Sequence, residues 1–188
     1  MPRVSKEEKQ RSHDRILDAA SKLTREKGID ATSVADIMSL AGLTHGGFYR
    51  HFQSKDDLVA SGFRHAVDEA VGSIEQESSG EQRRVARQTY IDRYLSSEHL
   101  DTNADGCPIA ALASELIRKD GRTKSEGLQA VKRVSSLLED DVNSVSGEVI
   151  LAMLVGSITL ARLSETSEDG EALLSATKRA IESLRNVH

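Results

Sequence analysis

Apolar side chains recur at helical spacing in almost every segment of this 188-residue chain, and the segments between them are short. One such stripe runs through Leu58, Val59, Phe63, Ala66, Val67, Ala70 and Ile74. A period near 3.6 places these side chains on one face of a helix. The pattern therefore predicts an all-α protein of about nine helices.

Composition agrees with a helical protein that has a packed core. The chain is 38% hydrophobic but only 3% aromatic, with two Pro and no Trp, which does not resemble a β-sandwich or barrel. Cys107 is the one cysteine, so no intramolecular disulfide can form and a reducing cytoplasm is expected. The N-terminus lacks the apolar run of a signal peptide. The apolar stretch from Val149 to Leu163 is too short to span a bilayer, so no membrane association is expected.

Charge is distributed unevenly along the chain. Residues 1–65 hold 11 Lys and Arg against 9 Asp and Glu, together with four of the six His, whereas the remaining residues hold 14 against 21. A mildly basic segment that precedes a larger acidic one indicates two separate tasks.

The expected helices suggest two domains. Residues 1–53 form a small helix-turn-helix domain preceded by a polar arm (1–11), and residues 54–188 form a larger domain, with a helix over 54–77 linking the two. Glu77–Glu81 resembles a short linker. The periodic segments that predict the helices are 12–27, 34–40, 45–52, 54–77, 81–97, 107–119, 123–141, 146–164 and 169–186.

Helices two and three have the spacing of a helix-turn-helix. Ser33 and Asp36 form a capping box at the start of helix two, Ala41–Leu43 is the turn, and Thr44 is expected to cap helix three. An α-helix fits the major groove and presents its N-terminal residues to base edges. Helix three is too short to be stable alone, so its neighbours must hold it.

Gly46 and Gly47 occupy the start of helix three, although glycine weakens a helix. Their small size removes side chains where the backbone must approach DNA, and exposed amides at a helix start suit phosphate. Tyr49 can donate its hydroxyl to a phosphate. Further donors to phosphate or bases come from Thr44, His45, Arg50, His51 and Lys55, and the arm adds Arg3, Lys6, Lys9 and Arg11.

These residues resemble the N-terminal domain of TetR/AcrR-type transcriptional regulators over about residues 12–60. The resemblance rests on elements that recur in order at fixed spacing: Ile16–Ala20, Lys27–Gly28, Thr32–Ile37, Ala41–Leu43, Gly46–Phe52, Ser54–Lys55 and Leu58.

The resemblance implies a homodimeric all-α regulator of a double-stranded DNA operator. It implies DNA-facing positions at Ser33, His45, Gly46, Gly47, Tyr49, His51 and Lys55, and packing positions at Phe48 and Phe52. Family members often have a polar or small hydroxyl residue where Gly47 stands, so base readout here is expected to depend on His45, Arg50 and helix two. The last two helices, 146–164 and 169–186, are expected to pair with their mates, and their apolar spacing agrees independently.

A small-molecule pocket is implied in the larger domain. Tyr90 and Tyr94 lie four apart and either line this pocket or belong to the core; Cys107, Ser114 and Arg118 are further candidates. Cys107 precedes a helix start, which favours a thiolate sensor, but a small buried residue explains it more simply.

No metal or cofactor is expected. Asp101–Gly106 matches the opening of an EF-hand loop, but Leu112 stands where the bidentate Glu is needed, so a turn is predicted instead. His45 and His51 are spaced by six and do not share a helical face.

The sequence therefore predicts a repressor that is released from its operator by a small molecule or by thiol modification, and not an enzyme. An enzyme with Cys107 as nucleophile and a helical adaptor that binds protein through its helix-turn-helix remain the alternatives.

Overall fold

The computed structural model describes residues 6–77, 80–139 and 145–185, and all regular elements within these ranges are helices, as predicted. They are α1 (Lys6–Lys27), α2 (Val34–Leu40), the 3₁₀ helix η1 (His45–Arg50), α3 (Lys55–Glu75), α4 (Gly80–Tyr94), α5 (Ser97–Asp101), α6 (Pro108–Leu116), α7 (Gly121–Leu138), α8 (Gly147–Ala161) and α9 (Ser167–Arg185). The short helix α5 was not predicted.

The first helix is longer than predicted, because α1 begins at Lys6 and not at about Ser12. Lys6–Arg11 is therefore mainly helix and not an extended arm. This turn has no apolar stripe, but Lys, Glu, Gln and Arg are good helix formers, and a solvent-exposed turn needs no apolar face. Arg3 lies outside the described residues.

The described residues form two separate hydrophobic cores. The smaller core lies between α1, α2, η1 and the start of α3, which we call the head; it contains Ile16, Ala19, Ala20, Leu23, Ile37, Met38, Ala41, Phe48, Phe52 and Leu58. The larger core lies in the body, formed by α4 to α9 and the rest of α3. Leu58 packs in the head, and Val59 and Phe63 pack in the body. One continuous helix thus belongs to both cores.

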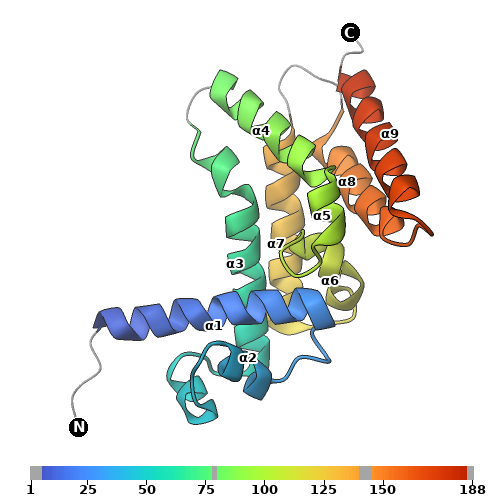
Figure 1. Cartoon of the computed structure of the whole chain (residues 1–188). Helices are drawn as coiled ribbons and strands as arrows, with labels where there is room; N and C mark the ends of the chain where they lie inside the picture. The colour runs from blue at the N-terminus through green and yellow to red at the C-terminus, as the bar shows by residue number, and fades with distance from the viewer. Residues whose placement is uncertain (1–5, 78–79, 140–144, 186–188) are drawn as a thin grey trace.

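Figure 1 shows α1 crossing α3, with α2 on the outer side of α1 and with α8 and α9 together on one flank of the body. The crossing of α1 and α3 is close: a Cβ atom built on Gly62 would lie 3.0 Å from the Cβ of Ala20 and 3.3 Å from the backbone nitrogen of Ser21. Gly62 therefore allows the two helices to approach to backbone contact.

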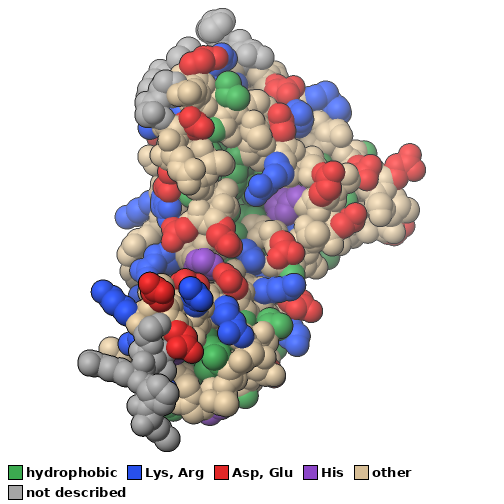
Figure 2. Space-filling model, turned by 60° about the vertical axis from the view of Figure 1, so that its left-hand side comes forward, with side chains coloured by type: hydrophobic (Ala, Val, Ile, Leu, Met, Phe, Trp, Pro, Cys, Tyr) green, Lys and Arg blue, Asp and Glu red, His purple; other side chains and the backbone are tan. Residues whose placement is uncertain are grey.

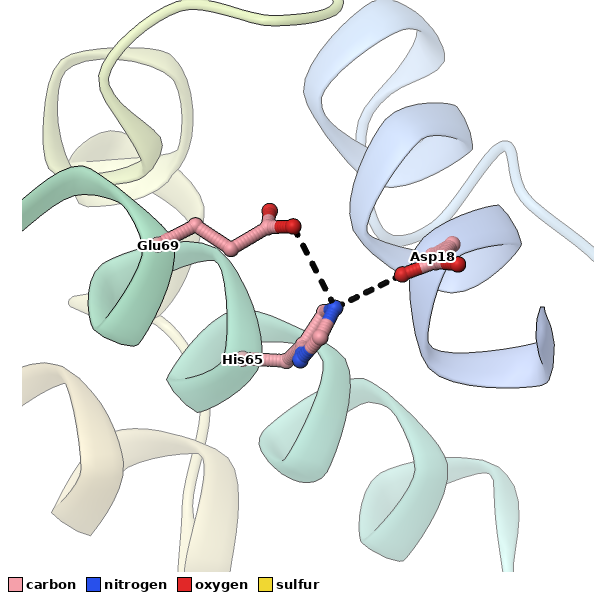
Figure 3. Close-up of side chains that lie close together, drawn as sticks. All are labelled: Asp18, His65 and Glu69. Carbon is pink, nitrogen blue, oxygen red and sulfur yellow. Dashed lines mark hydrogen bonds and ion pairs between the residues drawn. The ribbon is translucent and has the colours of Figure 1, made fainter. Parts of the chain in front are cut away.

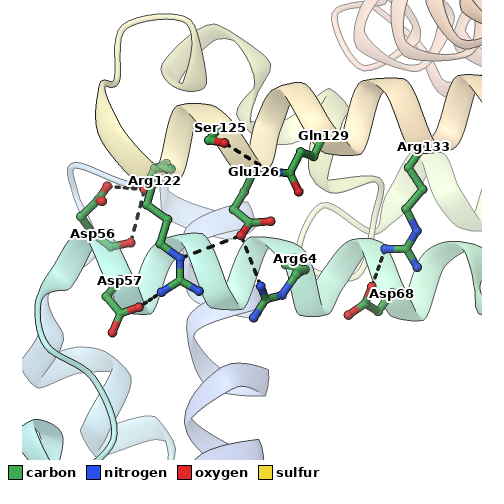
Figure 4. A network of polar contacts seen from close by, with 10 residues as sticks. Asp56, Asp57, Arg64, Asp68, Arg122, Ser125, Glu126, Gln129 and Arg133 are labelled. Carbon is green, nitrogen blue, oxygen red and sulfur yellow. Dashed lines mark hydrogen bonds and ion pairs between the residues drawn. The ribbon is translucent and has the colours of Figure 1, made fainter.

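A row of ion pairs fastens α3 to α7 along their length (Figure 4). Near the start of α3, Asp57 pairs with Arg122 of α7. Arg64 of α3 pairs with the buried Glu126 of α7 at 3.3 Å. Near the end of α3, Glu75 pairs with Arg133 of α7 at 2.6 Å. Arg133 also reaches Asp68 at 2.5 Å. Because α3 begins in the head, these ion pairs connect the helix that leaves the head to α7.

In the described part of the chain, no helix combines the length and the apolar character needed to cross a membrane.

Candidate nucleic-acid interface and ligand cavity

The predicted capping box starts α2. The Ser33 hydroxyl accepts a hydrogen bond from the Asp36 backbone N–H at 3.1 Å and donates one to the Asp36 carboxylate at 2.5 Å, which also accepts from the Ser33 N–H. These bonds hold the pKa of Asp36 below its usual value. Ser33 is exposed, but its hydroxyl already takes part in the cap.

The turn between α2 and η1 requires glycine at one position. Gly42 has φ +66°, in the left-handed region, and a Cβ there would lie 2.5 Å from an Arg15 guanidinium nitrogen. The Leu43 N–H then bonds to the carbonyl of Met38 at 2.9 Å. This local geometry turns the chain sharply into η1.

The third helix is a 3₁₀ helix over His45–Arg50, and not the α-helix over 45–52 that the sequence predicted. The Gly47 N–H bonds to the Thr44 carbonyl at 2.9 Å, three residues back, which is the 3₁₀ pattern. Two adjacent glycines lower the preference for α-helix, and the element is too short to overcome this. Thr44 precedes η1 in extended conformation, but its side chain forms no capping bond, contrary to expectation.

Two phenylalanines anchor η1 to the head. Phe48 and Phe52 are buried, with ring centroids 6.1 Å apart, which confirms them as packing positions. Tyr49, between them in sequence, is 74% exposed. The same short segment therefore fixes its backbone with two rings and presents a third ring to solvent.

The two glycines of η1 meet no steric limit within the protein. A Cβ on Gly46 would have no atom within 4 Å, and one on Gly47 would make ordinary contacts with Met38 at 3.6 Å and Thr44 at 3.9 Å. Their φ angles are not in the left-handed region. The packing of the fold therefore does not require glycine at Gly46, and the start of η1 presents bare backbone at this position.

His51 lies partly inside the head. Its ring is 5.8 Å from that of His13, and its Nδ1 is buried with no hydrogen-bond partner among the described residues. Burial first, and then the charges of His13, Lys9 and Arg50, lower its pKa. His51 is therefore suited to packing and neutral hydrogen bonding more than to charge.

The other interface candidates are accessible in varying degree. Thr44, His45, Gly46 and Arg50 are exposed, and Lys55 is half-buried at the first position of α3. Ser54 caps α3 by accepting from the Asp57 N–H at 3.0 Å, as predicted. On the face shown in Figure 2, Lys and Arg stand among Asp and Glu without a broad area of one sign.

A cavity of about 390 Å³ opens where the head meets the body. Tyr90, Tyr94 and Cys107, which were expected to line a ligand pocket, line this cavity, and both tyrosines also belong to the core. Ser114 and Arg118 do not line it; they are exposed, because the other face of α6 packs inward. The polar lining that sequence reasoning missed comprises Arg25, Glu69, Arg93, Ser96, Glu98, His99, Thr102 and Asp105.

Arg25 of α1 lines the cavity, so the head contributes to its wall. Arg25 lies near the end of α1 and donates to the carbonyl of Gly106 at 3.4 Å. Its Nε is buried and has no hydrogen-bond partner within the described ranges. Burial lowers the pKa of Arg25, partly offset by Asp105 and Glu69. The nearby hydroxyl of Tyr94 is also buried without a well-formed hydrogen bond. The wall of the cavity thus contains two buried donors that lack a well-formed bond among the described residues.

His99 organises the turn before α6. Its Nδ1 lies 2.7 Å from the Tyr94 carbonyl, and its Nε2 accepts from the Cys107 backbone N–H at 3.0 Å. Because an N–H can only donate, the imidazole is neutral with its proton on Nδ1. Burial lowers the pKa of His99. Arg162, the residue directly after α8, completes the turn by donating to the carbonyls of His99 at 2.8 Å and Thr102 at 3.1 Å.

Cys107 is buried at the N-terminus of α6, where its sulfur accepts from the Ala110 N–H at 3.5 Å. Burial raises the pKa of the thiol. Desolvation thus outweighs the helix terminus that favours a thiolate. The preceding Asp101–Gly106 segment is the end of α5 followed by a turn, as predicted.

Residues 16–61 match the family model described as bacterial regulatory proteins, tetR family. The transcriptional regulator AcrR of Shigella flexneri is 40% identical over 60 residues, which is 32% of this chain and 28% of that protein. TtgR of Pseudomonas putida is 42% identical over 59 residues, which is 31% of this chain and 28% of the length of TtgR. These matches thus span less than a third of either regulator.

Longer matches are weaker in identity. An HTH-type transcriptional regulator of Mycobacterium tuberculosis is 24% identical over 179 residues, 93% of this chain and 89% of that protein. A TetR-family regulator from Agrobacterium tumefaciens has a similar structure, with a TM-score of 0.70 at 24% identity over 94% of this chain and 98% of its own. The reduced form of NemR from Escherichia coli has a TM-score of 0.67 and is 18% identical in sequence. This match covers 89% of this chain and 95% of NemR.

The structural neighbours show the fold of the whole chain, and the sequence matches identify its helix-turn-helix. Residues 16–61 therefore belong to the TetR family of bacterial regulatory proteins, and the whole chain has the fold of TetR-family structures.

Proposed function

We propose that this protein is a homodimeric repressor that binds an operator in double-stranded DNA and releases it when a small molecule enters the body. Residues 1–53 are the DNA-binding domain, and residues 54–188 bind the effector and the partner copy. The observation that carries the proposal is η1, which exposes Tyr49 beside two sterically unconstrained glycines while Phe48 and Phe52 anchor it.

The DNA contacts divide into two kinds. Tyr49, Arg50 and Lys55 contact phosphates, and bare amides at Gly46 and Gly47 allow the backbone to come close. His45 is exposed at the start of η1 and reads base edges. We expect affinity to depend on these few contacts, together with Lys9 and Arg11 of α1.

Dimerisation through α8 and α9 is supported by an unpartnered apolar face. Leu151, Leu154 and Ile158 are buried within the protomer, whereas Val149, Leu160 and Leu163 are 48%, 58% and 77% exposed. A Cβ on Gly156, on the same side of α8, would meet nothing within 4 Å. Ala176, Ala180 and Leu184 extend an exposed apolar row on α9. A face of this kind requires a partner, and a second copy supplies the matching one. Val187 lies outside the described residues.

The effector acts through contacts that join the cavity to the head. Arg25 of α1 and Glu69 of α3 both line the cavity, so a ligand that fits one arrangement of these helices better than another changes the position of the head. The ligand shifts the equilibrium only by its differential affinity for the two states. The buried donors of Arg25 and Tyr94 favour a ligand with acceptor atoms.

The alternatives receive less support from the geometry. A nucleophilic Cys107 would need a base, yet the nearest imidazole, His99, uses Nε2 to accept from the Cys107 amide. Release by thiol modification is disfavoured by the burial of Cys107. The protein is expected to act in the cytoplasm, where the DNA is.

Enrichment of random duplexes on the purified full-length protein tests the proposal. We expect recovery of a two-fold symmetric sequence, with binding that weakens steeply as salt increases. Tyr49→Phe should weaken binding to the selected and the scrambled duplex alike, while His45→Ala should alter the preferred sequence. Absence of salt-sensitive enrichment would reject the proposal and favour the adaptor.

A further inference from the structure

Three potential metal ligands converge where α1 crosses α3 (Figure 3). The Nε2 of His65 lies 2.7 Å from the Oδ1 of Asp18 and 3.6 Å from the Oε1 of Glu69. The ligand atoms of all three residues lie within 4.8 Å of one another. His65 and Glu69 are one turn apart on α3, and Asp18 comes from α1, so the cluster joins two helices.

The chemistry of this set fits a divalent transition metal. When the imidazole is neutral, the two carboxylates leave two negative charges, which one divalent ion neutralises. In the described part of the chain, neither carboxylate lies within ion-pair distance of a Lys or Arg, although Glu69 also interacts electrostatically with Arg25. One imidazole nitrogen with two carboxylate oxygens suits Zn²⁺ better than Mg²⁺, which prefers oxygen ligands and water.

The distances require only side-chain adjustment. Zinc bonds of about 2.0–2.1 Å in tetrahedral geometry separate ligand atoms by about 3.3–3.4 Å. The present separations of 2.7 and 3.6 Å fall on either side of this value. The side chains of Asp18 and Glu69 are 62% and 58% exposed, so rotation about their χ angles can bring both to a shared ion. Solvent can fill the remaining coordination position.

The backbone that carries the ligands is rigidly placed. Asp18 lies two residues before Ala20, and His65 lies three residues after Gly62, the pair at which α1 and α3 make their close contact. Sites on packed helices hold their ligands more accurately than sites on loops.

We propose that Asp18, His65 and Glu69 form a binding site for one divalent transition-metal ion, with Zn²⁺ as the representative ligand. The bound ion pins α1 against α3 and so fixes the head on the helix that continues into the body. Glu69 also lines the cavity, so a cavity ligand that draws its carboxylate away removes one metal ligand. The site therefore couples metal occupancy to the position of the head.

Calorimetric titration of chelator-treated, full-length protein with ZnCl₂ in a non-chelating buffer tests this site. We expect one ion per chain. Loss of an outer-shell partner of a metal site costs about 10–100-fold in affinity, so loss of a ligand in His65→Gln or Asp18→Asn should cost at least as much. Asp14→Asn is the matched control, because Asp14 is exposed one turn earlier on α1 and outside the cluster; it should bind like the wild type.

Thermal unfolding supplies a second measurement. Zinc at one hundred times its Kd should raise the Tm of the wild type and of Asp14→Asn by about 5–10 °C, and should leave that of His65→Gln unchanged. MgCl₂ should not reproduce the shift. Zinc binding that persists in His65→Gln would locate the ion elsewhere, for example at His13 and His51, and would overturn the proposal. Absence of binding to the folded wild type, or an equal effect of magnesium, would do the same.

Discussion

The carboxylate of Glu115 in α6 accepts a hydrogen bond from the backbone N–H of Ile29, with 2.9 Å between Oε2 and N. The Asp30 N–H bonds to the same oxygen at 3.3 Å. Gly28, with φ +87°, makes room for this contact, since a Cβ there would lie 2.6 Å from Oε1 of Glu115. Lys119 also pairs with Asp30. The head is therefore joined to the body at the end of α1 as well as through α3.

Removal of this carboxylate should loosen the end of α1. Glu115→Ala leaves two amides without their partner, and we expect a loss of about 1–3 kcal/mol in the free energy of unfolding, with faster hydrogen exchange at Ile29 and Asp30. Glu115→Gln keeps a carbonyl acceptor and should lose less. Glu26→Gln, an exposed change on α1, should have no effect. Unchanged exchange at Ile29 in the Ala variant would show that this bond does not hold the head.

The sequence was most informative about structure that depends on neighbouring residues. The spacing of Ser33 and Asp36 predicted the capping box, and apolar periodicity predicted the helices and the anchoring of Phe48. The Glu115–Ile29 bond and the Arg25 side of the cavity join residues more than eighty positions apart. No local signal marks such contacts, because they depend on how whole helices pack.

The same reasoning explains the local errors. Periodicity gave no sign that α1 extends to Lys6, because an exposed charged turn has no apolar stripe. It also assigned an α-helix to residues 45–52, since it could not weigh the cost of Gly46 and Gly47 against the anchoring of two phenylalanines. The Asp18–His65–Glu69 cluster escaped notice because its two helices are adjacent only in space.

Enlarging Gly46 should separate DNA binding from folding. A side chain at this position has no neighbouring atom within 4 Å and no unfavourable φ, so Gly46→Leu should retain the wild-type Tm. If the backbone approaches DNA here, the same variant should lose at least about tenfold in operator affinity by fluorescence anisotropy. Gly80→Leu, which is equally unhindered at the start of α4, is the control. Full affinity in Gly46→Leu would refute the close approach.

A charge on the apolar face of α8 should dissociate the dimer. Leu160 is 58% exposed, so Leu160→Glu should fold normally but sediment as a monomer. Loss of the second recognition element should weaken operator binding about hundredfold or more, as the effective-concentration argument predicts. Ile117→Glu changes a residue that is 74% exposed on α6 and should remain a dimer. A dimeric Leu160→Glu protein would place the interface elsewhere.

Stability should fall as the pH drops from about 7 to 5. Burial lowers the folded-state pKa of His99, and that of His51 falls similarly. The unfolded chain therefore binds more protons than the folded one below about pH 6.5, which favours unfolding. Above that pH, the two neutral histidines make their full contribution to the free energy of unfolding. Its loss levels off once the pH lies below the folded-state pKa values.

Urea unfolding across this range measures the effect, and carboxylates contribute little there because those with shifted pKa values titrate at lower pH. His99→Gln should be less stable at pH 7 but should show a shallower pH dependence, the remainder coming from His51. An unaltered slope in His99→Gln would mean that His99 is not the titrating group.

Cys107 should be nearly inert in the native protein. Its side chain is buried, and burial raises the pKa of the thiol, so both access and thiolate fraction are low. We expect an aromatic disulfide reagent to label native protein at least about tenfold more slowly than protein unfolded in urea. Reagent applied to native protein should leave operator binding unchanged, in the wild type as in Cys107→Ala. Rapid labelling with loss of DNA binding that Cys107→Ala prevents would instead identify Cys107 as a sensor, because only a thiol that opens to solvent before global unfolding can respond in this way.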